Sequence, residues 1–164
     1  MPTVYYGTNI ADGVLIASHG VILSEIEKRL LLLSNIAAGE DPKELERLAL
    51  ELYDRDHKKY ANPEKIYNVV VNTDLHGARG QSMDTVDTNF LDNHLILALD
   101  VKPELFETFR LDGSVTSYLA PRRLPIEGLF ELYFNQSPRN VELMTLAFDR
   151  FNPRPRHSSL LKEN

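Results

Sequence analysis

The stretch VYYGTNIADGVLIASHG, residues 4–20, decides how the chain begins to fold. Val4-Tyr5-Tyr6 is a short run of strand-forming residues, and Gly7-Thr8-Asn9 ends it with a turn signal. Residues 10–19 then fit a short helix, with Gly20 as its expected C-cap. The stretch therefore predicts a strand that runs directly into a helix.

Two capping signals downstream predict a helical hairpin over residues of about 24–60. Ser24 and Glu27 have the spacing of a capping box, in which the hydroxyl accepts from an orphan amide and the glutamate reaches back to the cap. Asp41-Pro42 opens a second helix with an N-cap acid and a proline at the first helical position. We expect helices over residues 24–37 and 42–59, packed through Ile26, Leu30, Leu33, Leu45, Leu48 and Leu52.

After Pro63 the hydrophobic pattern changes from helical to extended. Strands are predicted over residues 66–71, 95–101, 114–119 and 126–134, with a turn at 112–113, a loop at 121–125 and a last helix from 137 to 148. The predicted fold class is α+β: a split mixed or antiparallel sheet core, with N-terminal helices and the helical hairpin as an insertion. Residues 1–152 are expected to form one domain, and residues 153–164 a C-terminal tail.

The composition is that of an ordinary folded protein, with 43% apolar and 26% charged residues. No cysteine is present, which excludes disulfides, thiolate metal sites and a cysteine nucleophile. No apolar run approaches the roughly 20 residues that a membrane span needs, and no signal peptide is visible at the N-terminus. We therefore expect a cytoplasmic protein without a membrane partner.

The net charge of −6 is unevenly distributed. Residues 1–100 carry 9 Lys and Arg against 16 Asp and Glu, whereas residues 101–164 carry 9 against 8. Broad binding to nucleic acid relies on Lys and Arg that replace the counterions of the phosphates. Because residues 1–100 carry an excess of acidic side chains, we do not expect broad binding to nucleic acid.

Several segments, taken in order, resemble the ADP-ribosyltransferase fold, the group that includes bacterial toxins, poly-ADP-ribose polymerases and tRNA 2′-phosphotransferases. Tyr5-Tyr6-Gly7-Thr8 and the helix after it are similar to the first motif. Val69 to Ala78 resembles the second motif, and Ser117-Tyr118-Leu119 with the strand after it resembles the third. The resemblance spans most of residues 3–134 and implies NAD, or a related nucleotide, as the ligand and a macromolecule such as a protein as the acceptor.

The catalytic positions of this family are carried over with two departures. The first motif usually holds the ligand with His or Arg, and Tyr6 stands there; the third usually supplies a Glu, and Ser117 stands there. A serine brings no charge to oppose a developing cation, so slow or absent NAD hydrolysis is expected. The resemblance implies catalytic roles for Tyr6, Ser117 and, if its loop folds back, Glu127, and cofactor binding by Gly7, Thr8, Asn9, Thr73 and Tyr118. It also implies that Tyr6, Thr8, Thr73 and Ser117 converge on one pocket.

Three hypotheses remain open at this point. The chain is an NAD-dependent ADP-ribosyltransferase, an inactive binding or inhibitor module on the same fold, or an unrelated α+β structural protein of a virus or bacterium. Two weaker patterns predict no further site. Residues 77–82 are glycine-rich but lack a phosphate-loop fingerprint, so they are predicted to be a flexible loop. Asp84, Asp87 and Asp92 match no calcium loop, and no metal site is predicted.

Overall fold

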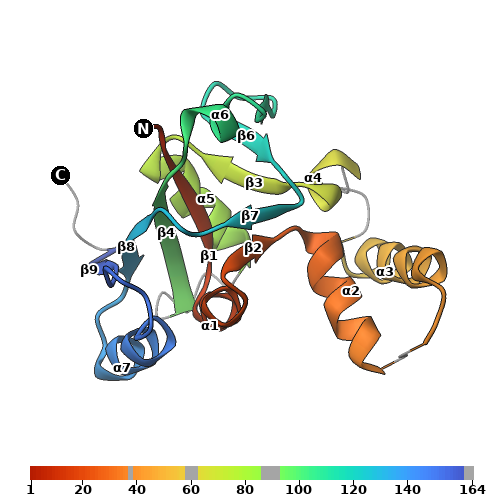
Figure 1. Cartoon of the computed structure of the whole chain (residues 1–164), viewed down its shortest axis with the longest axis horizontal. Helices are drawn as coiled ribbons and strands as arrows, with labels where there is room; N and C mark the ends of the chain where they lie inside the picture. Colours follow the sequence, from red (N-terminus) through yellow and green to blue (C-terminus); the bar gives the residue numbers. More distant parts are fainter. Residues whose placement is uncertain (37–38, 58–62, 86–92, 161–164) are drawn as a thin grey trace.

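A seven-stranded sheet forms the centre of the protein in the computed structural model, which describes residues 1–36, 39–57, 63–85 and 93–160 (Figure 1). The order is β5-β6-β3-β1-β4-β8-β9, and neighbours run antiparallel except β8 and β9, which run parallel. The strands of this sheet are β1 (Thr3–Asn9), β3 (Val69–Asn72), β4 (His94–Asp100), β5 (Arg110–Leu111), β6 (Ser117–Ala120), β8 (Leu129–Phe134) and β9 (Arg156–Ser158). The predicted α+β class with a mixed sheet is confirmed.

The two faces of the sheet are covered by different elements. One face, here called the core face, packs against α1 (Ile10–His19), α7 (Pro138–Ala147) and a small two-stranded sheet of β2 (Val21–Leu23) and β7 (Arg123–Pro125). The other face, here called the α5 face, is covered by α5 (Leu75–Thr85), which lies against β1 and β4. Strand β4 is therefore buried on both faces from His94 to Leu99, as its continuous apolar pattern predicts.

The predicted strand followed by a helix is confirmed, but the predicted turn at residues 7–9 is wrong, because these residues continue β1 and pair with β4. Strand β1 runs from Thr3 to Asn9, and α1 follows without a gap. The side chain of Asn9 caps α1 by accepting from the Asp12 amide at 2.8 Å. Gly20 ends the helix in the left-handed region, with φ of 73°, and donates to the Ile16 carbonyl.

The helical hairpin is also present, as α2 (Glu25–Ile36) and α3 (Pro42–His57), and Figure 1 shows it projecting from one side of the sheet. Its core is smaller than expected: Ile26, Leu45 and Ala49 are buried, whereas Leu48 is only half-buried. The capping box is half formed. Ser24 accepts from the Glu27 amide at 3.4 Å, but the Glu27 carboxylate is bound by Arg122 and Arg123 of the β7 segment rather than by the cap.

The segment after Pro63 departs from the prediction in two places. A short helix, α4 (Pro63–Tyr67), replaces the first half of the predicted strand, and β3 begins only at Val69. Proline fits the first turn of a helix, where its missing N–H costs nothing. Residues 77–82, predicted to be a flexible loop, lie inside α5. Asp87 and Asp92 lie outside the described residues, as does the side chain of Asp84.

The C-terminal half follows the predicted order with shorter strands, except that β7 occupies residues 123–125 of the predicted loop, where it pairs with β2. Asp112 and Gly113 form the turn between β5 and β6, with a φ of 68° at Gly113. A short helix, α6 (Pro103–Phe106), connects β4 to β5. Ser137 caps α7, as predicted, and residues 156–158 of the expected tail form β9. None of the described helices has the length and apolar character that a membrane crossing requires.

Candidate functional site

The central sheet opens between β1 and β3. Strand β1 pairs with β4 along its whole length, from Thr3 opposite Asp100 to Asn9 opposite His94. With β3 it shares the single recorded pair Tyr5 and Asn72. Antiparallel counting from that pair places Gly7 opposite Val70, two residues further along each strand. Between Gly7 and Val70, a side chain bonds both backbones in place of a direct backbone hydrogen bond.

That side chain is the carboxamide of Gln81 from α5. The Gly7 amide donates to Gln81 Oε1 at 3.0 Å, and Gln81 Nε2 donates to the Val70 carbonyl at 2.8 Å. A primary carboxamide therefore bridges a backbone donor on β1 and a backbone acceptor on β3. The opening is a slot whose hydrogen-bonding pattern is complementary to such a group.

Glycine at position 7 makes this arrangement sterically feasible. A Cβ on Gly7 would lie 2.0 Å from the Ala78 carbonyl oxygen and 2.7 Å from the Ser82 nitrogen, both backbone atoms of α5. A Cβ on Gly77 would lie 2.6 Å from Asn72 Oδ1. The two glycines let α5 lie directly on the sheet, and this close packing brings Gln81 into the slot.

Ser117 lies beside this slot, on the same face of the sheet. It is the strand partner of Asn72, which is buried and whose Nδ2 donates to Gln81 Oε1 at 3.4 Å. Ser117 Oγ donates to Asp112 Oδ2 at 3.4 Å, and Lys65 Nζ lies 3.4 Å from the same oxygen. We call Gly7, Val70, Asn72, Gln81 and Ser117 the split site; Asp112 lies beside it.

A second polar cluster lies on the opposite, core face of β1. Lys28 Nζ of α2 donates to the Tyr6 hydroxyl at 3.1 Å and lies 3.2 Å from Asp12 Oδ2. Thr8 Oγ1 donates to the same Asp12 oxygen at 2.6 Å. Burial raises the pKa of Tyr6 to about 12, although the Lys28 ammonium acts in the other direction. The polar groups of Tyr6 and Thr8 are thus engaged by side chains of α1 and α2.

The predicted site residues therefore fall into separate groups. Tyr6 and Thr8 lie on the core face, whereas Ser117 shares the α5 face with Tyr5 and Asn72, because successive strand residues point to opposite faces. The expected convergence of Tyr6 and Ser117 on one pocket is not found. Gly7 is the predicted cofactor residue that the structure joins to Ser117, through Gln81 and Asn72.

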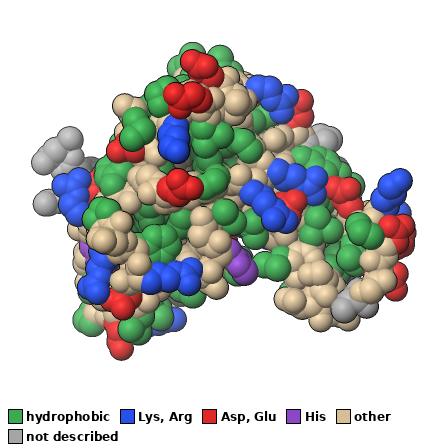
Figure 2. Space-filling model, viewed as in Figure 1, with side chains coloured by type: hydrophobic (Ala, Val, Ile, Leu, Met, Phe, Trp, Pro, Cys, Tyr) green, Lys and Arg blue, Asp and Glu red, His purple; other side chains and the backbone are tan. Residues whose placement is uncertain are grey.

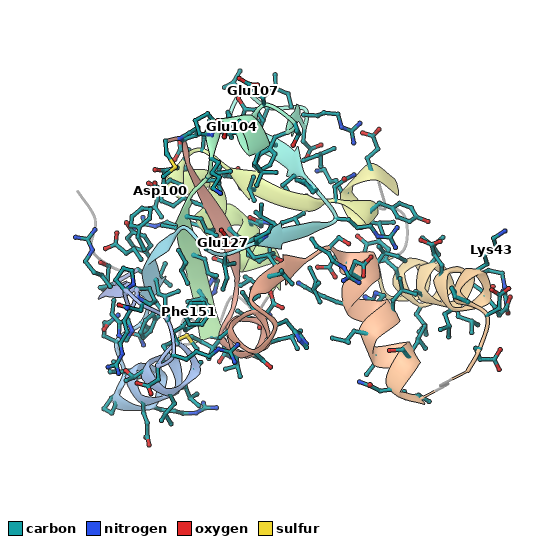
Figure 3. The ribbon with its side chains drawn as sticks, viewed as in Figure 1. Lys43, Asp100, Glu104, Glu107, Glu127 and Phe151 are labelled. Carbon is teal, nitrogen blue, oxygen red and sulfur yellow. The ribbon has the colours of Figure 1, made fainter. Side chains whose placement is uncertain are left out.

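The other predicted residues have local partners. Asn9 caps α1, and Thr73 binds the Thr116 carbonyl through its amide and its hydroxyl. Tyr118 packs against Phe106, with ring centroids 5.3 Å apart. Glu127 is exposed between β7 and β8, next to Ile126 of the core, and Figure 3 shows it in front of the strands. The partners named here for Asn9, Thr73 and Tyr118 all lie outside the split site.

The sequence prediction missed three residues of the split site, Val70, Asn72 and Gln81, and it also missed Asp112 beside them. Asn72 belonged to the second motif but carried no signal of burial, and Asp112 was interpreted only as a turn residue. Gln81 gave no signal, because its role depends on the helical register of a segment predicted to be a loop. The described residues contain no cluster of three potential metal ligands.

A separate hollow lies between the sheet body and the hairpin, where Figure 2 shows a notch. It encloses about 550 Å³ and is lined by apolar side chains with a polar rim: Val21, Leu23, Leu30, Leu31, Pro42 and Leu45, with His19, Glu27, Ser34 and Arg123. None of the predicted site residues lines it.

The fold of this chain, a seven-stranded sheet with α5 lying across β1 and β4, is similar to that of a solved protein. A solved structure with this architecture is DarT of Thermus sp. 2.9, in complex with ADP-ribosylated single-stranded DNA. The two superpose with a TM-score of 0.52 over 96% of this chain and 93% of that chain, at 13% sequence identity. No protein-family description matches the sequence, and no curated protein matches it. The resemblance predicted from the motifs is thus confirmed at the level of the fold.

Proposed function

We propose that this protein is an NAD-dependent ADP-ribosyltransferase that binds the nicotinamide end of its substrate at the split site. The observation that carries the proposal is the carboxamide slot between β1 and β3. Gly7 N–H and Val70 C=O already hold a primary carboxamide, that of Gln81. Nicotinamide carries the same group on an aromatic ring, so the donor and acceptor present in the slot fit it.

The residues around the slot have distinct roles in this proposal. Gly7 and Val70 would orient the ligand amide, and Asn72, buried beside them, would limit the space to a planar group. Gln81 is half-buried, and its carboxamide lies at the end of a flexible side chain. On binding, the ligand would replace Gln81 in the two hydrogen bonds to Gly7 and Val70. Those bonds are neutral, so exchanging them for equivalent bonds to a ligand costs little net free energy.

When bound, NAD supplies the ADP-ribosyl group: its bond from ribose to nicotinamide breaks with the electron pair leaving on nicotinamide, and an acceptor atom bonds the ribose carbon and releases its proton to solvent. The acceptor is proposed to be a macromolecule. The net charge of −6 favours a protein acceptor, whereas the similar DarT was solved with ADP-ribosylated single-stranded DNA. Incubation with labelled NAD and either class of acceptor separates these two alternatives.

The slot is tested by removing its internal carboxamide. Gln81→Ala should increase the affinity for nicotinamide and NAD, because the ligand no longer competes with Gln81. Gln136→Ala is the matched control: its amide also bonds backbone carbonyls, of Phe134 and Ser158, but away from the slot. Ligand-induced shifts of the thermal midpoint measure affinity, since binding to the folded state alone stabilises it by RT ln(1 + [L]/Kd).

Three outcomes are informative. A larger shift for Gln81→Ala than for the wild type and Gln136→Ala supports the slot as the ligand site. Binding without release of nicotinamide would favour the inactive binding module, in which Ser117 brings no charge to the site. If neither the wild type nor a folded Gln81→Ala variant responds to NAD or nicotinamide, the proposed function is wrong.

A further inference from the structure

The third-motif position lacks its acid, yet a carboxylate lies one hydrogen bond away from it. Ser117 Oγ donates to Asp112 Oδ2 at 3.4 Å. Other nearby carboxylates are engaged elsewhere: Asp74 accepts from the His76 amide at the start of α5, and Glu131 binds Tyr133 and Ser158 on the far side of β4. Asp112 is thus the carboxylate that the recorded contacts connect to the split site.

The backbone fixes Asp112 in this place. Strands β5 and β6 pair Arg110 with Leu119 and Leu111 with Tyr118, so the register brings residue 112 opposite residue 117. The Asp112 amide donates to the Ser117 carbonyl at 2.9 Å and closes the hairpin. Gly113 makes the turn possible, with φ of 68°, where a side chain would be strained. The carboxylate is therefore positioned by the hairpin rather than by a flexible side chain alone.

The surroundings of Asp112 shield its carboxylate from solvent. Its side chain is only 9% exposed, whereas the cation that faces it, Lys65, is 50% exposed. Both recorded contacts fall on Oδ2, from Ser117 and from Lys65. A carboxylate largely shielded from solvent acts more strongly on groups in the site than an exposed one, because solvent screens its charge less.

We infer that Asp112 is the displaced acid of this site and that Ser117 connects it to the ligand; this inference rests on the proposed function. Asp112 is a positioning residue. By accepting the Ser117 hydrogen, it turns the free lone pairs of Oγ toward the slot, where they can accept from a ribose hydroxyl. It also places a negative charge close to the position at which positive charge develops, and charge placed there in advance stabilises a transition state.

The test moves the carboxylate instead of only deleting it. Asp112→Asn keeps the size of the side chain and one oxygen that can accept from Ser117 but loses the charge. It should slow nicotinamide release about 100-fold, the scale seen when a charge-stabilising group is lost. Ser117→Glu in that background returns an acid to the third-motif position and should restore release. A residue with only a structural role would not be rescued in this way.

Two further measurements keep the inference separate from the proposed function. The thermal shift with NAD reports binding without turnover, and Asp112→Asn should retain it because the slot is intact. Glu104→Gln, an exposed carboxylate on α6 (Figure 3), is the matched control and should leave both release and binding unchanged.

The outcomes distinguish three cases. If the wild type binds NAD and releases nicotinamide but Asp112→Asn releases it equally fast, Asp112 is not the acid and the proposed function stands. If release disappears with Glu127→Gln and not with Asp112→Asn, the acid is Glu127 and the inference is overturned. If the wild type neither binds NAD nor releases nicotinamide, the proposed function itself fails.

Discussion

On the core face of β1, Tyr6 and Thr8 are joined to Lys28 and Asp12, whereas on the α5 face Gly7 is joined through Gln81 to Val70. The first cluster contains a partly buried ion pair, and removing one partner of such a pair is strongly destabilising. The second consists of neutral amide hydrogen bonds, each with a net contribution of about 1 kcal/mol. A ligand with a carboxamide can therefore displace the second cluster far more easily than any ligand can displace the first.

This difference changes which residue of the first motif belongs to the proposed site: it is Gly7 and not Tyr6. Tyr6 stands at the first-motif position, but its hydroxyl is occupied by Lys28, and its side chain points away from Ser117. Gly7, which follows it, faces α5 and takes part in the slot. The contribution of the first motif to the proposed site is thus the backbone of its glycine rather than the side chain before it.

The largest effect is expected from Gly7→Ala, which tests whether the α5 face depends on close packing. The new Cβ would collide with backbone atoms of Ala78 and Ser82, so α5 must move or the variant loses about 3 kcal/mol of its free energy of unfolding. Gly80→Ala on the same helix has no atom within 4 Å of its Cβ and should stabilise by up to about 1 kcal/mol. Urea denaturation measures both. Equal stabilities would show that α5 does not constrain position 7.

A smaller effect is expected on the core face, from Lys28→Met. The substitution leaves the Asp12 carboxylate without its cation, and we expect a loss of about 2 kcal/mol, less than for a fully buried pair because Lys28 is 20% exposed. Adding Asp12→Asn should recover most of the loss. Lys43→Met, at the far end of the hairpin in Figure 3, is the matched control and should change stability little. If the single and double variants are equally stable, Lys28 and Asp12 are not coupled.

The sequence predicted most of the fold because its signals are local. The strand and helix of residues 4–20, the hairpin and the cap at Ser137 each depend on neighbouring residues, and each is present. The pairing of β2 with β7 was missed, since both are three-residue strands about 100 residues apart. Strand β9 was missed for a similar reason, because its pairing partner is β8 and not an adjacent segment.

The candidate site was predicted less well than the fold, because contacts between side chains across the sheet leave no signal in the local sequence pattern. Gly7 and Ser117 were singled out from motifs, but Gln81 and Asp112 reach them only through the packing of α5 and the register of β5 with β6. The grouping of Tyr6 with Ser117 ignored the alternation of side chains along two paired strands. That alternation can be applied only once the register is known.

The smallest expected effect concerns His94, which joins α5 to the sheet next to the slot. It pairs with Asn9 in the β1–β4 ladder, is 3% exposed, and its Nδ1 lies 3.0 Å from Ser82 Oγ. The Ser82 hydroxyl donates to the Arg79 carbonyl at 2.8 Å, so its oxygen is left to accept, and His94 Nδ1 carries the hydrogen. Burial lowers the pKa of His94 below its ordinary value, and the ring is neutral in the folded protein at pH 7.

Because the folded-state pKa of His94 lies below the unfolded value of about 6.5, its contribution to stability is present above that pH and is lost as the pH falls through the folded-state pKa. His94→Asn keeps an amide donor near the Nδ1 position but does not titrate. The free energy of unfolding of the wild type should therefore fall more steeply than that of His94→Asn between pH 7 and pH 5, as measured by urea denaturation at each pH. His76→Asn, at an exposed position of α5, is the matched histidine control. Parallel curves for the wild type and His94→Asn would mean that protonation of this ring does not loosen the contact between α5 and the sheet.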